Sequence, residues 1–83
     1  MDKTFQVGIY SSDNIIYEGQ LASLVVPSES CYLGVLAFHA PLIARLKPGI
    51  ITFKDNSGKT VTVNVSQAGY IEVLQNKATI LLG

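Results

Sequence analysis

The stretch Thr60-Val61-Thr62-Val63-Asn64-Val65 decides the fold class, because its valines alternate strictly with polar residues. A period of two places the three valines on one face of an extended chain and the Thr and Asn side chains on the other. Most of these residues are β-branched, which suits a pleated surface. The sequence therefore predicts a half-buried β-strand over residues 60–65.

The same alternation recurs on both sides of this strand. Every second position is apolar in three more segments: Phe5, Val7 and Ile9; Ile51 and Phe53; Ile71 and Val73. Residues typical of turns separate the runs about every ten positions, at 11–14, 19–20, 27–28, 48–49, 55–58 and 75–77. Short strands at this spacing predict an all-β fold, specifically a two-sheet antiparallel β-sandwich in the form of a flattened barrel.

Two apolar segments leave alternatives open. Residues 41–46 fit either one or two helical turns begun by Pro41 or another strand. Residues 32–38 are continuously apolar. That pattern favours either a strand buried in the sandwich core or a rim that meets a protein partner, since apolar and aromatic residues are enriched at interfaces.

The composition narrows the class of protein. The chain has 83 residues, 48% of them apolar and 14% charged, so we expect one folded domain over residues 1–83. Six basic residues balance six acidic ones without clustering, which argues against nucleic acid or an anionic lipid surface as a partner. A single cysteine cannot form an internal disulfide, as expected in a reducing compartment. Residues 1–6 lack the features of a signal peptide.

Catalytic chemistry has weak support in this sequence. Cys31 and His39 are the only thiol and the only imidazole, and they could form a nucleophile–base pair if a turn brought them together. Nothing in the sequence orients the imidazole, however, and a zinc site needs three or four ligands. The carboxylates occur singly, and the glycines form no phosphate-binding motif. We therefore expect no catalytic residue, no cofactor and no metal, with a small thiol enzyme kept as an alternative.

A set of ordered motifs resembles a known family. His39-Ala40-Pro41-Leu42 is followed at fixed spacing by Leu46-Lys47-Pro48-Gly49, and the pair resembles the N-terminal β-sandwich domain of the epsilon subunit of F-type ATP synthases, named delta in mitochondria. Further matching motifs cover nearly the whole chain without gaps: Ile16-Tyr17-Glu18-Gly19, Leu24-Val25-Val26-Pro27, residues 69–73 and residues 76–81.

The resemblance implies a non-catalytic rotor subunit of the central stalk. Such a subunit links the gamma subunit to the ring of c-subunits and couples ion-driven rotation to ATP synthesis. It implies a peripheral location on the cytoplasmic face of a bacterial inner membrane, without a direct lipid anchor. The alternative is a stand-alone β-sandwich adaptor that binds an extended peptide at a sheet edge. An unpaired edge strand over residues 60–65 would favour that adaptor.

The resemblance also implies two interaction sites. The loop facing the c-ring corresponds to Ser28, Glu29, Ser30, Cys31 and Tyr32, and the gamma interface corresponds to Ser11, Phe38, His39, Ala40 and Leu42. The chain departs from the family where Cys31-Tyr32 replaces Gly-Glu and Ala37-Phe38 replaces Pro-Gly. Both departures predict a more apolar interface, with Glu29 or Tyr32 replacing the missing carboxylate, and the second loses a permissive glycine. Pro48-Gly49 suits a type II turn.

Full-length relatives continue past the last strand into a two-helix C-terminal domain. That domain inhibits ATP hydrolysis and, in some members, binds ATP. The sequence ends at Gly83, where the last expected strand is complete. The sequence therefore represents either a naturally short form or a trimmed portion of a longer chain, and on this sequence we expect no helical-hairpin inhibition and no nucleotide site.

Overall fold

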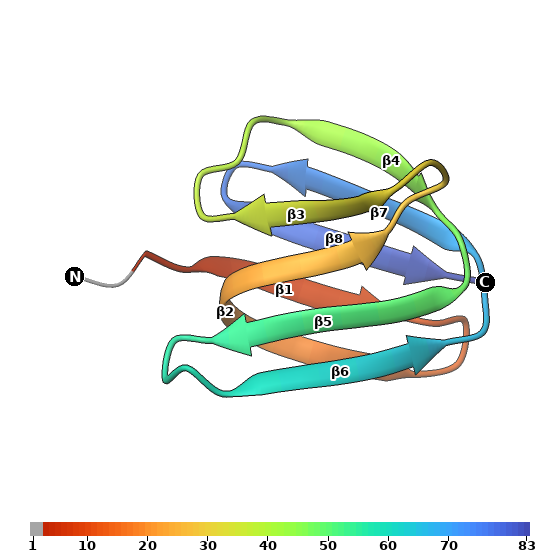
Figure 1. Cartoon of the computed structure of the whole chain (residues 1–83), viewed down its shortest axis with the longest axis horizontal. Coiled ribbons are helices and arrows are strands. Elements are labelled where there is room, and N and C mark those ends of the chain that lie inside the picture. Colours follow the sequence, from red (N-terminus) through yellow and green to blue (C-terminus); the bar gives the residue numbers. More distant parts are fainter. Residues whose placement is uncertain (1–2) are drawn as a thin grey trace.

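The computed structural model describes residues 3–83, which form eight β-strands and no helix (Figure 1). The strands are β1 (Phe5–Tyr10), β2 (Ile15–Pro27), β3 (Tyr32–Leu36), β4 (Leu42–Leu46), β5 (Gly49–Asp55), β6 (Thr60–Val65), β7 (Gly69–Leu74) and β8 (Lys77–Leu82). Within this part of the chain, no helix could cross a membrane. Met1 and Asp2, which begin the segment tested for a signal peptide, lie outside the described residues. The all-β prediction is confirmed.

The long strand β2 is shared by two layers. Its first half pairs antiparallel with β1, from Ile15 opposite Tyr10 to Leu21 opposite Phe5. Its second half pairs with β5 on one side and with β3 on the other, after a register shift between Leu21 and Ser23. One layer therefore runs β4-β7-β8-β1-β2 and the other β3-β2-β5-β6. The expected sandwich is present, although β1 and β8 pair in parallel rather than antiparallel.

The core lies between the inner faces of the two layers. Every strand contributes to it, and no polar side chain of the described residues is buried. The fully buried members with the largest side chains are Phe5, Ile9, Leu21, Leu24, Ile51, Ile71 and Ile80. Burying one such side chain contributes about 1.5–3 kcal/mol, which is how an apolar core stabilises a small sandwich without a disulfide.

The structure resolves both segments whose fold was open. Residues 42–46 form strand β4, paired antiparallel with β7, so the helical alternative is wrong. In β3 only Val35 is buried, whereas Tyr32 is 59% exposed and Leu36 63%. The core-strand interpretation of residues 32–38 is therefore wrong. Among the described strands this apolar segment pairs with β2 alone, so it forms an edge strand that presents large side chains to solvent.

Two of the turn signals have a different structural meaning. Gly19 lies inside β2 opposite Val7, where a Cβ atom would come within 2.7 Å of the Tyr17 hydroxyl, so no turn forms there. Gly49 begins β5 and has no positive φ, so the type II turn prediction is wrong. A Cβ atom on Gly49 would instead lie 3.1 Å from the Pro27 ring, which indicates that close packing requires this glycine.

Loops gather at two opposite ends of the sandwich (Figure 1). The left end in that view, which we name the groove end, carries the β3–β4 loop (37–41), the β5–β6 turn (56–59) and the β7–β8 turn (75–76). The right end, which we name the C-terminal end, carries the β1–β2 turn (11–14), the β2–β3 turn (28–31) and Gly83. The candidate residues divide between these two ends.

Candidate functional site

An open groove of about 650 Å³ lies at the groove end, between the β3–β4 loop and the β7–β8 turn. Three of the expected gamma-interface residues, Phe38, His39 and Ala40, line one wall together with Pro41. The other wall is formed by residues 74–76, of which Leu74 is exposed and apolar. The structure therefore brings most of the expected interface residues together in one apolar depression.

Asn76 ties the two walls of the groove together. Its Oδ1 atom accepts a hydrogen bond of 2.6 Å from the Phe38 backbone N–H, and its Nδ2 donates one of 3.0 Å to the Thr4 carbonyl. Gln75 and Asn76 both have positive φ, at 51° and 60°, as a two-residue type I′ hairpin turn requires. These contacts hold the β3–β4 loop against the β7–β8 hairpin.

Phe38 adopts a conformation that is unusual for a bulky residue. Its φ is 61°, in the left-handed region, and its side chain is 70% exposed. This conformation costs an L-residue roughly 1–2 kcal/mol. Because the ring is mostly exposed, its burial contributes little free energy to offset that cost. Phe38, which stands where the resemblance implies a glycine, thus keeps a glycine-type backbone and exposes its ring to solvent.

The gamma-interface candidates other than Phe38 differ in their surroundings. His39 is half-buried, and its Nδ1 lies 2.7 Å from the Ala40 carbonyl oxygen. Leu42 begins β4 and packs against the core. Ser11 follows β1 at the C-terminal end, where its N–H donates to the Asn14 carbonyl at 2.9 Å. The length of β1 therefore separates Ser11 from the groove, and these residues do not form one continuous site.

The residues expected to face the c-ring form a tight turn at the C-terminal end. Both the N–H and the hydroxyl of Ser28 donate to the Cys31 carbonyl, the former at 2.9 Å. Ser28 also forms a bridge with Leu46, which fixes the turn to the end of β4. Glu29, Ser30 and Cys31 are exposed, as is Tyr32. The turn thus presents its tip to solvent.

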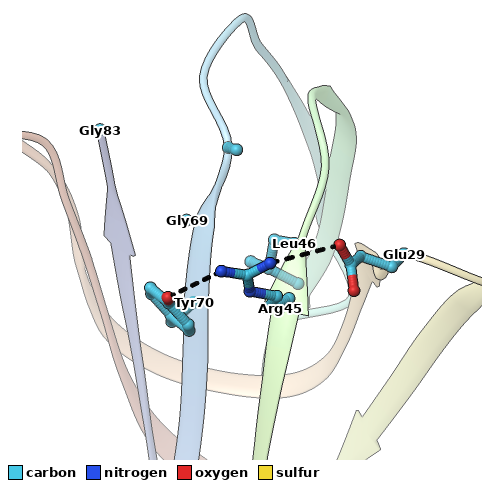
Figure 2. A pocket seen from close by; sticks show the side chains of 7 residues that line it. Glu29, Arg45, Leu46, Gly69, Tyr70 and Gly83 are labelled. Atoms are coloured by element: carbon cyan, nitrogen blue, oxygen red, sulfur yellow. Dashed lines mark hydrogen bonds and ion pairs between the residues drawn. The ribbon is translucent and has the colours of Figure 1, made fainter.

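A shallow pocket of about 250 Å³ adjoins this turn (Figure 2). Inside it the Arg45 guanidinium lies 3.8 Å from the Glu29 carboxylate, donates to the Tyr70 hydroxyl at 3.5 Å and lies 5.8 Å from the centre of that ring. The Tyr70 hydroxyl and, less strongly, Glu29 raise the pKa of Arg45 above its usual value. Glu29, expected to replace the missing carboxylate, thus already has a cationic neighbour, in an exposed and therefore weak pair.

The sequence interpretation missed Arg45 and Tyr70. Their contact depends on the pairing of β4 with β7, which places Arg45 directly opposite Tyr70. Assigning residues 42–46 as a strand would have pointed Arg45 outward, on the same face as Ile43. The register that brings Tyr70 beside it is not readable from either segment alone.

The thiol-enzyme alternative fails on geometry. Cys31 precedes β3 and His39 follows it, so the two side chains lie at opposite ends of that strand. Five residues of strand span about 16 Å, too far for a nucleophile–base hydrogen bond. No three His, Cys, Asp or Glu side chains between residues 3 and 83 come together in a way that could hold a metal ion.

Comparison with known proteins agrees with the fold and the motifs. Residues 4–83 match the family model described as ATP synthase, Delta/Epsilon chain, beta-sandwich domain. The chain is 43% identical over 82 residues to the ATP synthase epsilon chain of Dichelobacter nodosus, covering 99% of this chain and 56% of that one. It is 42% identical over 79 residues to the Bacillus pumilus epsilon chain, covering 95% and 59%. The chain therefore spans a little over half the length of these relatives.

Solved structures show the same fold. A chain of the Euglena gracilis mitochondrial ATP synthase, in a structure of OSCP, F1 and c-ring, matches with a TM-score of 0.88 at 22% identity, over 95% of this chain and 50% of that one. A chain of the central stalk and c-ring of the Tetrahymena thermophila mitochondrial ATP synthase matches with a TM-score of 0.73 at 13% identity, over 99% and 66%. Together with the family match, which extends from Thr4 to the last residue, these likenesses show that the chain belongs to the delta/epsilon β-sandwich family of ATP synthase subunits.

Proposed function

We propose that this chain is a non-catalytic rotor subunit of the central stalk of an F-type ATP synthase. It links the gamma subunit to the c-ring, so that ion-driven rotation of the ring reaches the catalytic head. Family membership supports this proposal, as do the two solved assemblies, whose descriptions include a c-ring and, in one case, the central stalk. In this role the chain is a peripheral component at the cytoplasmic face of a bacterial inner membrane, without a lipid anchor of its own.

The sandwich has the mechanical properties that such a role needs. Strand β2 runs through both layers, pairing with β1 in one and with β3 and β5 in the other. A force applied to one layer therefore reaches the other through continuous backbone as well as through the packed core. Closely packed interiors have low compressibility and transmit strain, which suits a coupling element between two rotating partners.

We propose that the gamma contact lies at the groove end. The observation that carries this assignment is Phe38, which keeps a positive φ and an exposed ring in a loop held by Asn76. A strained backbone whose cost is not offset by packing of the side chain in the core points to a functional constraint. An exposed aromatic ring beside Leu74 is the kind of anchor that protein interfaces favour. His39 and Ala40 extend the same surface, Leu42 follows at the start of β4, and Ser11 would meet gamma separately.

The c-ring contact is placed at the opposite end of the sandwich, on residues 28–32. There Tyr32 provides exposed aromatic surface, and Glu29 provides a carboxylate shared with Arg45. The groove contact with gamma and the c-ring contact would then lie at opposite ends of one rigid body, and Ser11 would meet gamma at the C-terminal end. We expect Tyr32→Ala to weaken assembly with the ring while leaving the binary complex with gamma intact.

Co-elution with the gamma subunit from the same source tests the proposal. We expect the wild-type chain to form a one-to-one complex on size-exclusion chromatography, and the double variant Phe38→Ala, His39→Ala to lose it. Ile50→Ala is the matched control, because Ile50 is also exposed and apolar but lies in β5, which contributes no residue to the expected gamma interface. Failure of the wild-type chain to bind gamma, both alone and with detergent-solubilised c-ring, would contradict the rotor function.

The adaptor alternative has one structural feature in its favour. β6 is an edge strand that, of the strands in residues 3–83, pairs with β5 only, as that alternative requires. Adaptor function gives no reason, however, for a family match that runs from residue 4 to residue 83. We therefore favour the rotor subunit and treat the β6 edge as a separate property of the fold.

A further inference from the structure

The free edge of β6 is the feature that the rotor function does not use. In Figure 1 this strand forms the lower margin of the molecule. It pairs with β5 from Thr60 opposite Lys54 to Val65 opposite Gly49, and no other described strand pairs with its far side. A row of backbone donors and acceptors is thus left open to pairing with another chain.

This edge lacks the devices that normally prevent such pairing. Charged side chains, prolines and bulges protect most exposed edge strands. β6 contains no charged residue and no proline, and its register with β5 is regular. The edge strand β4, by contrast, carries Arg45 and is flanked by Pro41 and Lys47-Pro48. β6 therefore lacks the protection that β4 has.

The hydrogen-bonding phase of the edge follows from the hairpin that precedes it. The Asp55 N–H donates to the Lys59 carbonyl at 3.0 Å, which fixes the alternation of bonded and non-bonded pairs along the two strands. On that alternation Val61, Val63 and Val65 bond to β5. The backbone groups of Thr60, Thr62 and Asn64 consequently point toward the free edge.

The sequence of β6 is nearly palindromic about Val63. In an antiparallel pair centred on that residue, Val63 lies opposite its own copy, Val61 opposite Val65, and Thr62 opposite Asn64. This register keeps valines facing valines on the core side and polar residues facing polar residues on the outer side, as a shared pleat requires. Thr62 and Asn64 are then the outward-bonding residues, so each pair exchanges two backbone hydrogen bonds.

Charge and burial also favour a second copy as the partner. Lys59 would lie opposite Gln67, so no like charges meet across the paired strands. Val61 and Val63 are half-buried and pack against the core. A neighbouring strand would cover the part of these two side chains that is still exposed. A self-complementary surface of this kind gives an isologous two-fold contact.

We propose that this chain, when it is outside the rotor, self-associates through antiparallel pairing of β6 with β6 of a second copy. The four-stranded layers β3-β2-β5-β6 of the two copies would merge into one continuous sheet. The contact depends only on the edge and its sequence. The β6–β6 proposal can therefore be tested independently of the gamma and c-ring contacts.

Cysteine trapping tests the register. Val63 falls at a non-hydrogen-bonded position of the new pair, where Cα atoms lie about 4.5 Å apart, within the range that a disulfide spans. In a Cys31→Ser background we expect Val63→Cys to form an intermolecular disulfide roughly ten times faster than Ile43→Cys. Ile43 is the matched control, because it lies on the edge strand β4 and is 72% exposed, so random collisions favour it. Equal or slower trapping at position 63 would overturn the proposal.

Sedimentation equilibrium of the full chain provides the second measurement. The wild-type chain should show a concentration-dependent dimer, which Thr62→Val keeps because it retains the N–H at this position. Thr62→Pro removes that donor from each copy and should raise the dimer dissociation constant roughly ten-fold or more. A wild-type monomer at all concentrations, or a dimer not trapped through Val63→Cys, would overturn the proposal. If Thr62→Pro fails to fold, the trapping experiment decides alone.

Discussion

The backbone N–H of Phe38 donates a hydrogen bond of 2.6 Å to the side-chain oxygen of Asn76, from a different loop of the sandwich. The side-chain nitrogen of Asn76 donates a second hydrogen bond, to the Thr4 carbonyl. One side chain therefore holds three parts of the chain together: the β3–β4 loop, the β7–β8 turn and the segment before β1. Asn76 therefore holds the two walls of the groove against each other.

Replacing Asn76 by alanine should lower the free energy of unfolding by about 2 kcal/mol. The variant loses two hydrogen bonds, leaves the Phe38 N–H without its acceptor and places alanine at a φ of 60°. Urea denaturation measures the loss. Asn76→Gly separates the two causes, because it removes the side chain without the backbone strain. An Asn76→Ala midpoint equal to that of the wild type would show that the side-chain contacts contribute nothing.

Substitutions at Phe38 should change stability and binding in different ways. Glycine tolerates the observed φ of 61° and alanine does not, so Phe38→Gly should be more stable than Phe38→Ala by about 1 kcal/mol. Both variants remove the ring and should therefore bind gamma equally weakly. Thermal denaturation and gamma co-elution give the two readouts. A glycine variant that binds as well as the wild type would show that the ring is not an interface anchor.

Sequence periodicity located the strands whose pattern reflects one buried face. Residues 60–65 are the clearest case, because Val61 and Val63 are half-buried and Val65 is buried, whereas the polar residues between them are exposed. Periodicity failed where pairing decided the outcome. The expected turn at Gly19 is absent because β1 pairs alongside it, and the apolar run after Cys31 is an exposed edge because only β2 pairs with β3. The Phe38–Asn76 contact could not be predicted, since it joins two turns that only the folded sheet brings together.

Glu18 should control the titration of Tyr10 on the outer face of β1. The Tyr10 hydroxyl donates to the Glu18 carboxylate at 2.7 Å, and this bond, with smaller effects of desolvation and charge, raises the pKa of Tyr10. The neutral phenol is favoured because it can donate to the carboxylate, whereas the phenolate would repel it. Glu18→Gln should therefore lower the pKa of Tyr10, measured from the ring resonances by NMR. An unchanged Tyr10 pKa in Glu18→Gln would contradict this control by Glu18.

The position of the Tyr10 ring also explains why residue 8 is a glycine. A Cβ atom at position 8 would collide with the Tyr10 ring, which lies across Gly8 on the same face. Gly8→Val should displace the ring and break its bond to Glu18, so that the pKa of Tyr10 falls as it does in Glu18→Gln. A Gly8→Val variant with an unchanged Tyr10 titration would contradict this arrangement.

The Asp55 carboxylate should make the stability of the β5–β6 hairpin depend on acid pH. One of its oxygens accepts hydrogen bonds from the Ser57 hydroxyl at 2.6 Å and from the backbone N–H groups of Ser57 and Lys59 at 2.9 and 3.0 Å. The Ser57 hydroxyl is the largest cause of a pKa lowered below its usual value, followed by the Lys59 N–H. A lowered folded-state pKa stabilises the fold above the unfolded value of about 3.9, and that stability is lost as the pH falls from there through the folded value. As the pH is lowered from 7 to 2, the urea midpoint should thus fall more steeply in the wild type than in Asp55→Asn, because the asparagine side chain cannot ionise. Parallel curves for the two proteins would show that this turn makes no ionisation-dependent contribution.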